Sequence, residues 1–384
     1  MARLLVIIPD HLSALVKKGE ITDRYYNPGN LFDEVHILMT NADQVDKNAI
    51  QKTVGRAQIE VHNLAHNYRL VLHSLGYRPI LLRKWAEEGV RLAKEIRPDL
   101  VRCHGNYLNG FIAAEIKRNL GVKYIMSLHG DHDRDLRYHA RWCYNWKEKL
   151  FYILMRRVER VNLQNADCVI CVYRFIEPYA RKYGAQRIEI IYNAVNQDNL
   201  LPKENYDLSN PVKIIIPGRQ LPQKDPAPLI RAVAEIPGAT LTLIGHGPIH
   251  DSLEKLAADL GISDRCFFFQ AMDNDELCRT LRNFDILVSI NDFGGVSKVE
   301  LEAAMVGMPM ITNAHPMETE PEILGQNCLV VDGSPASYKQ AILKFIGDME
   351  LRKNMGGKLR ESVKAITPEK MESEVVKIYK EFLK

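Results

Sequence analysis

Arg219 and Lys224 stand five positions apart on a turn that follows the apolar run Val212–Ile216. The run has the length and composition of a buried strand, and the residues after the turn follow a helical pattern. A guanidinium and an ammonium at this spacing can lie beside one anionic group, which is what diphosphate binding requires. The motif alone leaves open a second interpretation, a solvated loop with charges that flank a helix.

Two more motifs that suit a phosphorylated ligand follow later strands. The segment LIGHGP places Gly245 and Gly247 on a short turn, where the missing side chain lets backbone approach a ligand closely. Gly294 and Gly295 precede Ser297, which is well placed to begin a helix. Exposed N–H groups at a helix N-terminus bind phosphate, so we expect part of an anion site there.

Glu302 lies within that helix and has apolar residues on both sides of it in the sequence. A carboxylate in such a stretch is rarely buried without a partner, because an unpaired buried charge is costly. A ribose diol, which donates two hydrogen bonds, would suit it. The alternative is a glutamate on the solvent face of the helix.

The elements that must position these residues alternate through nearly the whole chain. Short apolar runs of strand type are separated by amphipathic helical runs, from Leu4–Pro9 to Cys328–Val331. This alternation predicts parallel sheets covered by helices on both faces. A polar stretch at 196–211 separates two such series, so we predict an α/β protein with two doubly wound Rossmann-like domains, over residues 1–197 and 198–367. Ligands bind beyond the carboxyl ends of the strands in such sheets, and a cleft between the two domains is the expected site.

Composition narrows the class of protein. A net charge of +3 over 384 residues argues against nucleic acid as a partner. The seven cysteines are odd in number and scattered, which favours reduced thiols, and Cys168 and Cys171 are expected to be buried on one strand. No run approaches the ~20 apolar residues of a membrane span, and the first residues do not have the pattern of a signal peptide. We therefore expect a cytoplasmic protein, or one that lies on a membrane surface.

The motifs occur in an order that is typical of one family. GRQLPQK, LIGHGP and LEAAMVGMP follow one another, with DNDELCRTLRNFDILVSI before the last and NADCVICVY and IIYNAV in the first half. In this combination the chain resembles the retaining glycosyltransferase family 4, which has the GT-B fold. The resemblance implies two Rossmann-like domains facing a central cleft, with a helix at 368–384 that packs back on the first domain. It also implies metal-independent transfer of a hexosyl group from a nucleoside diphosphate sugar to a glycan, lipid-linked or small-molecule acceptor, as in polysaccharide biosynthesis, without a cofactor.

The resemblance assigns roles on the donor side. Arg219 and Lys224 would hold the diphosphate, Glu302 would hold the ribose, and backbone near Met272 would hold the base.

One departure from the family pattern concerns the sugar. A glutamate that contacts the sugar hydroxyls is usual eight positions before Glu302, and this chain has Gly294 there. Asp292, two residues earlier, could supply a carboxylate if the loop is rearranged. The ribose and phosphate contacts are therefore better supported than any contact with the sugar.

Histidines follow two strands in the first half. The turn that begins with His129 resembles the family's His-Gly turn, whose histidine faces the donor sugar, and Asp131 would be an acceptor-side carboxylate. His104 ends another strand and is a candidate for the acceptor side, with a core or loop histidine as the alternative. Gly19 takes the place of the family's glycine-rich loop, which approaches the donor phosphates or the acceptor.

The predicted site residues are, as catalytic groups, His129, Arg219 and Lys224; as donor-binding groups, Gly19, Gly245, Gly247, Met272, Asp292, Gly294, Gly295, Ser297 and Glu302; and on the acceptor side, His104 and Asp131.

Three alternating carboxylates suggest a metal site, but their context argues against one. Asp131, Asp133 and Asp135 are followed by Leu136, where a calcium loop needs glycine, and by Trp142, where it needs glutamate. We therefore predict no metal.

The segment 138–164 combines aromatic and basic residues in a helical pattern. Such a helix can lie in a membrane interface, so peripheral membrane contact is one expectation. A core-facing helix with a solvated basic face is the other. Among functions, a glycoside phosphorylase, a sugar-nucleotide epimerase and a catalytically silent sugar-nucleotide-binding protein remain as alternatives to transfer.

Overall fold

The computed structural model describes residues 1–66, 70, 79–134, 146–195, 197–290, 295–314 and 321–383, without the side chains of 79, 147–149 and 151–152. The chain divides into two compact units, Met1–Asn193 together with Pro368–Lys384, and Ala194–Thr367. The division thus falls after Asn193, where the sequence led us to expect 197.

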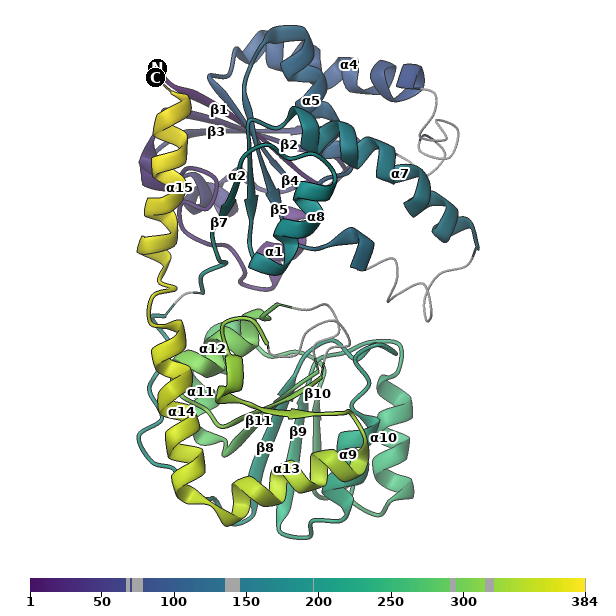
Figure 1. The fold of residues 1–384 in the computed structure, drawn as a ribbon, viewed down its shortest axis with the longest axis vertical. Helices are drawn as coiled ribbons and strands as arrows, with labels where there is room; N and C mark the ends of the chain where they lie inside the picture. The colour runs from purple at the N-terminus through teal and green to yellow at the C-terminus, as the bar shows by residue number, and fades with distance from the viewer. Residues whose placement is uncertain are drawn as a thin grey trace. The chain divides into compact units, whose positions relative to one another are not determined.

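Unit 1 is a parallel sheet with helices on both faces (Figure 1). Its strands are β1 (Arg3–Ile8), β2 (Glu34–Met39), β3 (Gln58–Asn63), β4 (Leu100–His104), β5 (Tyr124–Leu128), β6 (Cys168–Cys171) and β7 (Ile188–Ile190). Its helices are α1 (Leu12–Lys17), α2 (Lys47–Ile50), α4 (Pro79–Ile96), α5 (Leu108–Leu120), α7 (Trp146–Asn165), α8 (Glu177–Lys182) and α15 (Pro368–Phe382). Within the described residues the strand order is β3-β2-β1-β4-β5-β6-β7.

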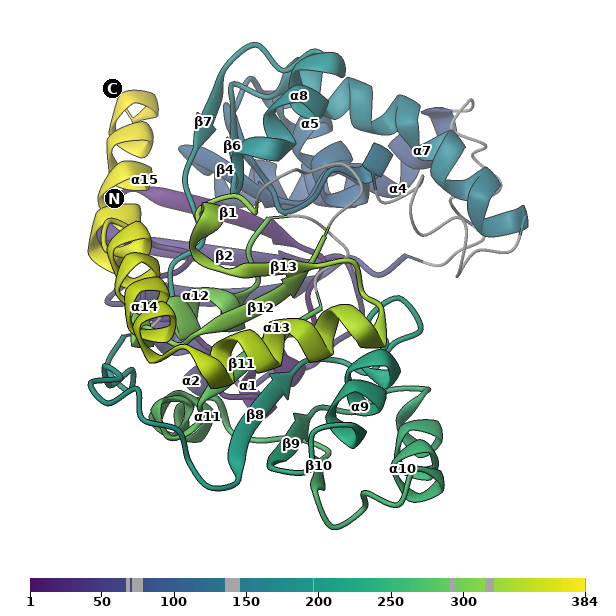
Figure 2. The same ribbon diagram turned by 60° about the horizontal axis from the view of Figure 1, so that its bottom comes forward.

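Buried strands hold this sheet together. β1 reads RLLVII and has five buried residues in succession, as expected for a strand covered on both faces. One face packs against α1, the chain around Tyr26 and Phe32, and α15, whose Tyr379 is buried. Figure 2 shows α15 beside the N-terminus on this unit. The helix is also tied down by Glu372, which accepts two hydrogen bonds from the Arg24 guanidinium, at 2.9 and 3.0 Å.

Unit 2 repeats the architecture. Its strands are β8 (Val212–Pro217), β9 (Ala239–Ile244), β10 (Cys266–Phe269), β11 (Ile286–Ser289), β12 (Met310–Asn313) and β13 (Leu329–Val331). Its helices are α9 (Ala227–Ala234), α10 (His250–Asp259), α11 (Asn274–Thr280), α12 (Lys298–Val306), α13 (Pro335–Gly347) and α14 (Met349–Val363). The strands are parallel, in the order β10-β9-β8-β11-β12-β13 among the described residues. Side chains of α9, α10 and α13 form one hydrophobic cluster with these strands.

Each sheet has a point at which the direction of strand addition reverses. In unit 1 the chain adds β2 and β3 on one side of β1 and then β4 on the other side. In unit 2 it adds β9 and β10 on one side of β8 and then β11 on the other side. A crevice forms beyond the carboxyl ends of the strands at such a switch point, and ligands of doubly wound proteins bind there. No helix in the described parts of the chain is long and apolar enough to cross a membrane.

Candidate functional site

The predicted donor residues of unit 2 flank its switch point. Arg219 is the second residue after β8, and Ser297 and Glu302 belong to the connection that follows the neighbouring strand β11. Arg219 is exposed, and Lys224 is half-buried on the same turn, where its N–H donates to the carbonyl of Leu221 at 2.8 Å. The turn is therefore ordered by its own backbone, and it presents the guanidinium at the end of the sheet.

Gly245 and Gly247 support that turn from behind. A Cβ on Gly245 would lie 2.0 Å from the carbonyl oxygen of Gly218, and one on Gly247 would lie 1.9 Å from the carbonyl oxygen of Gln220. Both distances are far below a van der Waals contact, so the two loops can meet backbone to backbone only where side chains are absent. The N–H of Gln220 also donates to the carbonyl of His246 at 3.3 Å. These glycines thus fix the position of the Arg219 turn.

The N-terminus of α12 is closed by a capping box. Ser297 is the N-cap residue, its hydroxyl accepts from the Glu300 N–H, and the Glu300 carboxylate accepts from the Ser297 N–H at 2.6 Å. Glu300 is buried, and its carboxylate also accepts a hydrogen bond from the Thr312 hydroxyl. Gly295 is buried just before the cap. Gly294 and Asp292, including the position where the family pattern has a glutamate, lie outside the described residues.

Glu302 is buried, with 1% of its surface exposed, so the solvent-face interpretation of this residue is wrong. Its carboxylate accepts a hydrogen bond from the Asn274 amide at 3.2 Å, and the Lys298 ammonium lies 3.8 Å away. Lys298 Nζ also donates to the side-chain Oδ1 of Asn274 at 2.6 Å. Burial, together with the nearby Glu302 charge, raises the pKa of the Cys278 thiol to about 12. Met272 is half-buried two residues before Asn274, between β10 and α11.

These partners of Glu302 were not among the residues predicted from the sequence. Lys298 stands four positions before Glu302 on a predicted helix, and that spacing could have revealed it. Asn274 is 28 positions away and had no comparable signal.

In unit 1 the two predicted histidines lie next to each other at the carboxyl ends of β4 and β5. The ring centroids of His104 and His129 are 5.9 Å apart, and the ring planes are inclined by 24°. His104 is buried, whereas His129 is exposed. Burial, the Arg102 guanidinium and His129 together hold the pKa of His104 well below its usual value. His104 is therefore a neutral imidazole at physiological pH.

Arg102 is an unexpected cation beneath this histidine pair. It is 8% exposed, and its guanidinium donates to the hydroxyls of Tyr379, at 3.2 Å, and of Ser127. Its charge lies 5.7 Å from the centre of the Tyr379 ring. In the part of the chain that the structure describes, no carboxylate lies within ion-pair distance of Arg102. Arg102 was not among the predicted site residues, although an arginine inside the apolar strand LVRCH is a signal that could have revealed it.

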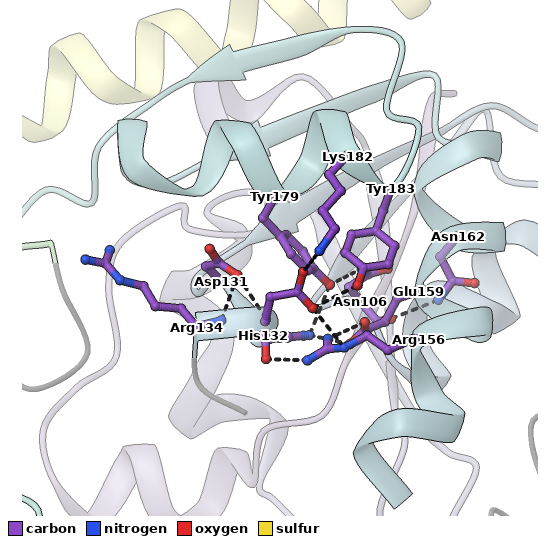
Figure 3. Close-up of polar contacts among 11 residues, drawn as sticks. Asn106, Asp131, His132, Arg134, Arg156, Glu159, Asn162, Tyr179, Lys182 and Tyr183 are labelled. Carbon is purple, nitrogen blue, oxygen red and sulfur yellow. Dashed lines mark hydrogen bonds and ion pairs between the residues drawn. The ribbon is translucent and has the colours of Figure 1, made fainter. Parts of the chain in front are cut away.

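Asp131 caps the helical turn that follows β5. Its Oδ1 accepts from the N–H groups of Asp133 and Arg134, at 2.9 and 3.1 Å (Figure 3). Asp133, the next carboxylate of the alternating series, pairs with Arg156 at 3.0 Å and with Lys182. Asp135 lies outside the described residues. Among those that are described, no group of three or more His, Cys, Asp or Glu side chains is arranged to hold a metal ion.

A buried ionic network stands behind this turn. Glu159 of α7 is fully buried, and it accepts from His132 at 2.6 Å and from Arg156 at 2.5 Å (Figure 3). From the same helix, Asn162 donates to the carbonyls of Asn106 and Tyr107, at 3.0 and 2.9 Å. Because Asn106 follows β4 and His132 follows β5, α7 fixes both histidine-bearing strand ends at once.

Gly19 ends α1, with a left-handed φ of 67° and an N–H that donates to the carbonyl of Val16 at 3.1 Å. This is a helix-stop geometry that favours glycine. Cys168 and Cys171 are both buried in β6. Burial raises the pKa of each thiol to about 12, so neither is a ready nucleophile.

Comparison with known proteins agrees with this architecture. The model of the family described as "Glycosyltransferase Family 4" matches residues 32–199, and that described as "Glycosyl transferases group 1" matches residues 200–362. An uncharacterised glycosyltransferase from Methanocaldococcus jannaschii is 25% identical over 91% of this chain and 90% of its own length. A GDP-mannose-dependent alpha-(1-6)-phosphatidylinositol monomannoside mannosyltransferase from Mycolicibacterium smegmatis is 27% identical over 48% of this chain and 53% of its own.

Among solved structures, the Anabaena protein HepE in complex with UDP-glucose superposes with a TM-score of 0.71 at 15% identity, over 99% of this chain and all of that one. Two parallel-sheet α/β units with this likeness define the GT-B class of fold. The chain belongs to glycosyltransferase family 4 and is a glycosyltransferase.

Proposed function

We propose that this glycosyltransferase moves a hexosyl group from a nucleoside diphosphate sugar to a hydroxyl acceptor, with retention at the anomeric carbon and without a metal ion. The observation that carries the proposal is the switch point of unit 2, where the exposed Arg219 and the buried Glu302 follow adjacent strands. A solved relative in fold holds UDP-glucose, and a curated relative is named for GDP-mannose, which supports a nucleotide-sugar donor without naming its base.

The proposed chemistry is electrostatic. Negative charge develops on the diphosphate as the bond to the sugar breaks, and cations aimed at it lower the barrier. Arg219 and Lys224 would supply that charge, so that the protein needs no divalent ion. Ser297 and Glu300 already use their N–H groups in the capping box, so a phosphate at α12 would be met by the N–H groups of Lys298 and Val299.

The first test is a thermal-shift screen of the full chain against UDP-, GDP- and ADP-sugars, because a bound ligand raises apparent stability. Arg219→Ala should weaken donor binding about 10–100-fold, since a charge-assisted hydrogen bond contributes about 1.5–3 kcal/mol. Arg231→Ala, which removes an exposed arginine from α9, is the matched control. Unchanged donor binding and turnover in Arg219→Ala would refute the assignment.

Product analysis tests whether transfer retains the anomeric configuration and whether it needs a metal ion. The anomeric proton of the product, observed by NMR, reports retention or inversion, and turnover in EDTA reports whether a metal is needed. Donor binding without turnover across an acceptor panel would instead favour a silent nucleotide-sugar-binding protein.

We also propose peripheral membrane contact through α7, as the segment 138–164 suggested. Trp146 and Ile153 are 70% and 57% exposed, and with Leu150 and Arg157 they recur at spacings of three to four residues. This spacing places apolar side chains and a cation on one helix face, which suits a lipid surface of negative charge. The exposed Arg160 adds to the same basic character.

Co-sedimentation with vesicles of phosphatidylglycerol and phosphatidylcholine tests this contact. Ile153→Ser should lower the bound fraction, whereas Leu343→Ser, which removes a leucine of 44% exposure from α13, should not. No sedimentation of the unaltered protein at low salt would end the idea.

A further inference from the structure

Tyr25 is an exposed aromatic residue at the switch point of the first sheet. It is 45% exposed, whereas the next residue, Tyr26, is buried in the core of unit 1. A single exposed aromatic ring is ordinary on a protein surface. The surroundings of Tyr25 are less ordinary, because the backbone of its sequence neighbours Arg24 and Tyr26 is fixed by hydrogen bonds.

The backbone on each side of Tyr25 is fixed. The N–H of Arg24 donates to the carbonyl of Lys52 at 2.8 Å, and the N–H of Tyr26 donates to the carbonyl of Thr53 at 2.9 Å. The Arg24 side chain is also bound by Glu372 of α15. The Tyr25 ring therefore extends from a fixed segment of backbone. A ligand that binds to it would lose little free energy to ordering of this loop.

The Tyr25 ring begins a row of three rings. Its centroid lies 5.4 Å from that of His104, with an inclination of 39°, and His104 in turn lies 5.9 Å from His129. Tyr26 meets His104 edge-on at 5.8 Å and supports it from the core. The outer members of the row, Tyr25 and His129, are exposed, and the middle member is buried.

This combination suits a carbohydrate. Recognition sites for small polar molecules combine an apolar surface with a few polar groups that fix orientation. The apolar C–H face of a pyranose can pack on a tyrosine ring, while its hydroxyls bond to imidazole nitrogens. A neutral imidazole offers one donor and one acceptor, and the Arg102 charge beneath His104 disfavours its protonated form.

We propose that Tyr25 forms the stacking face of an acceptor-sugar subsite, with the neighbouring imidazole of His104 binding a hydroxyl of the same sugar and His129, at the end of the row, left to face the donor sugar. The subsite rests on the proposed transfer activity, because an acceptor is needed only if transfer occurs. It adds a residue that determines which acceptor is bound, and it leaves the donor contacts in unit 2 unchanged.

Steady-state transfer kinetics at saturating donor test the subsite. Tyr25→Ala should raise the acceptor KM about three- to tenfold, the range expected for one lost aromatic contact, while the donor KM and the rate of donor hydrolysis without acceptor stay unchanged. Tyr25→Phe keeps the ring and should restore the acceptor KM. Phe267→Ala, which removes a ring with the same 45% exposure from β10, is the matched control.

A binding measurement separates failure of the subsite from failure of the proposed function. Saturation-transfer NMR with methyl α-D-glucopyranoside, methyl α-D-mannopyranoside and maltose should show sugar contact in the unaltered protein that Tyr25→Ala reduces and Phe267→Ala leaves intact. Sugar binding of this kind without any transfer would overturn the proposed function and keep the subsite. No binding of any of the three sugars, or equal binding and equal acceptor KM in Tyr25→Ala, would overturn the subsite.

Discussion

The two units use one architecture and build their ligand-facing ends in different ways. In unit 2, glycines and a helix cap set the site, and the residues concerned lie in two short stretches after β8 and β9 and in the start of α12. In unit 1, stacked rings and buried charges set the site, and their members come from distant parts of the chain. Arg102 and Tyr379, for example, are 277 positions apart. Unit 2 should therefore be sensitive to added side-chain atoms, and unit 1 to lost charges.

The largest effect is expected from Glu159 in unit 1. Glu159→Ala leaves Arg156 and His132 without the buried carboxylate that both contact. Removing one member of a buried ionic group costs about 3–5 kcal/mol of unfolding free energy. Urea denaturation, followed by a probe in unit 1, measures the loss.

The matched control is Glu177→Ala, which breaks the more exposed pair with Arg181 on α8. Such i,i+4 pairs contribute about 0.3–0.5 kcal/mol. A loss below about 1 kcal/mol in Glu159→Ala, well short of the expected range, would show that unit 1 does not depend on its buried charges.

The next effect concerns the glycines of unit 2. A methyl group at Gly247 would collide with the Gln220 carbonyl, so Gly247→Ala must displace the Arg219 turn. We expect a loss of about 1–3 kcal/mol in unfolding free energy, together with weaker binding of UDP, GDP or ADP in calorimetry. Gly238→Ala is the control, because a Cβ there meets no atom within 4 Å. Equal unfolding free energies and equal nucleotide affinities in the two variants would show that the close contact at Gly247 does not position the Arg219 turn.

These expectations show how far the sequence alone could go. The two parallel sheets, the start of α12 at Ser297 and the turn that carries Arg219 could all be predicted, because local periodicity and capping chemistry encode them. The partners of Glu302 and the rings around His104 could not be predicted, since they depend on which side chains meet after the sheets have formed. Asp131 illustrates the limit, because its carboxylate caps a turn that the alternating-aspartate pattern did not suggest.

A smaller effect should come from Asn274, which orients the proposed ribose-binding carboxylate. Asn274→Ala removes the hydrogen bond to Glu302 and the acceptor of Lys298. We expect about tenfold weaker nucleotide binding, the lower end of the range for one hydrogen bond to a charged group, because this bond orients Glu302 and does not itself reach the nucleotide. The preference for UDP over 2′-deoxy-UDP should fall as well. Asn205→Ala, at an exposed asparagine of the same unit, should change neither quantity. If Asn274→Ala kept the full preference for UDP over 2′-deoxy-UDP, Asn274 would have no part in ribose recognition.

The smallest effect is the pH dependence that His104 gives to unit 1. Burial, Arg102 and His129 hold the pKa of His104 well below its usual value. As the pH falls, His104 is therefore protonated in the unfolded chain before it is protonated in the native state. Unfolding free energy must then decrease as pH falls through about 6.5, and the single proton of His104 accounts for less than about 1 kcal/mol of that decrease between pH 7 and pH 6. His104→Gln should reduce this dependence in the unit 1 transition by the share of His104 and leave the transition of unit 2 unchanged; the remainder includes His129, because burial and Arg102 lower its pKa to about 4. Arg102→Met should flatten it only in part, since burial and His129 would still oppose protonation. If His104→Gln keeps the full slope, the native state does not disfavour protonation of His104, and the electrostatic part of the contrast between the units fails.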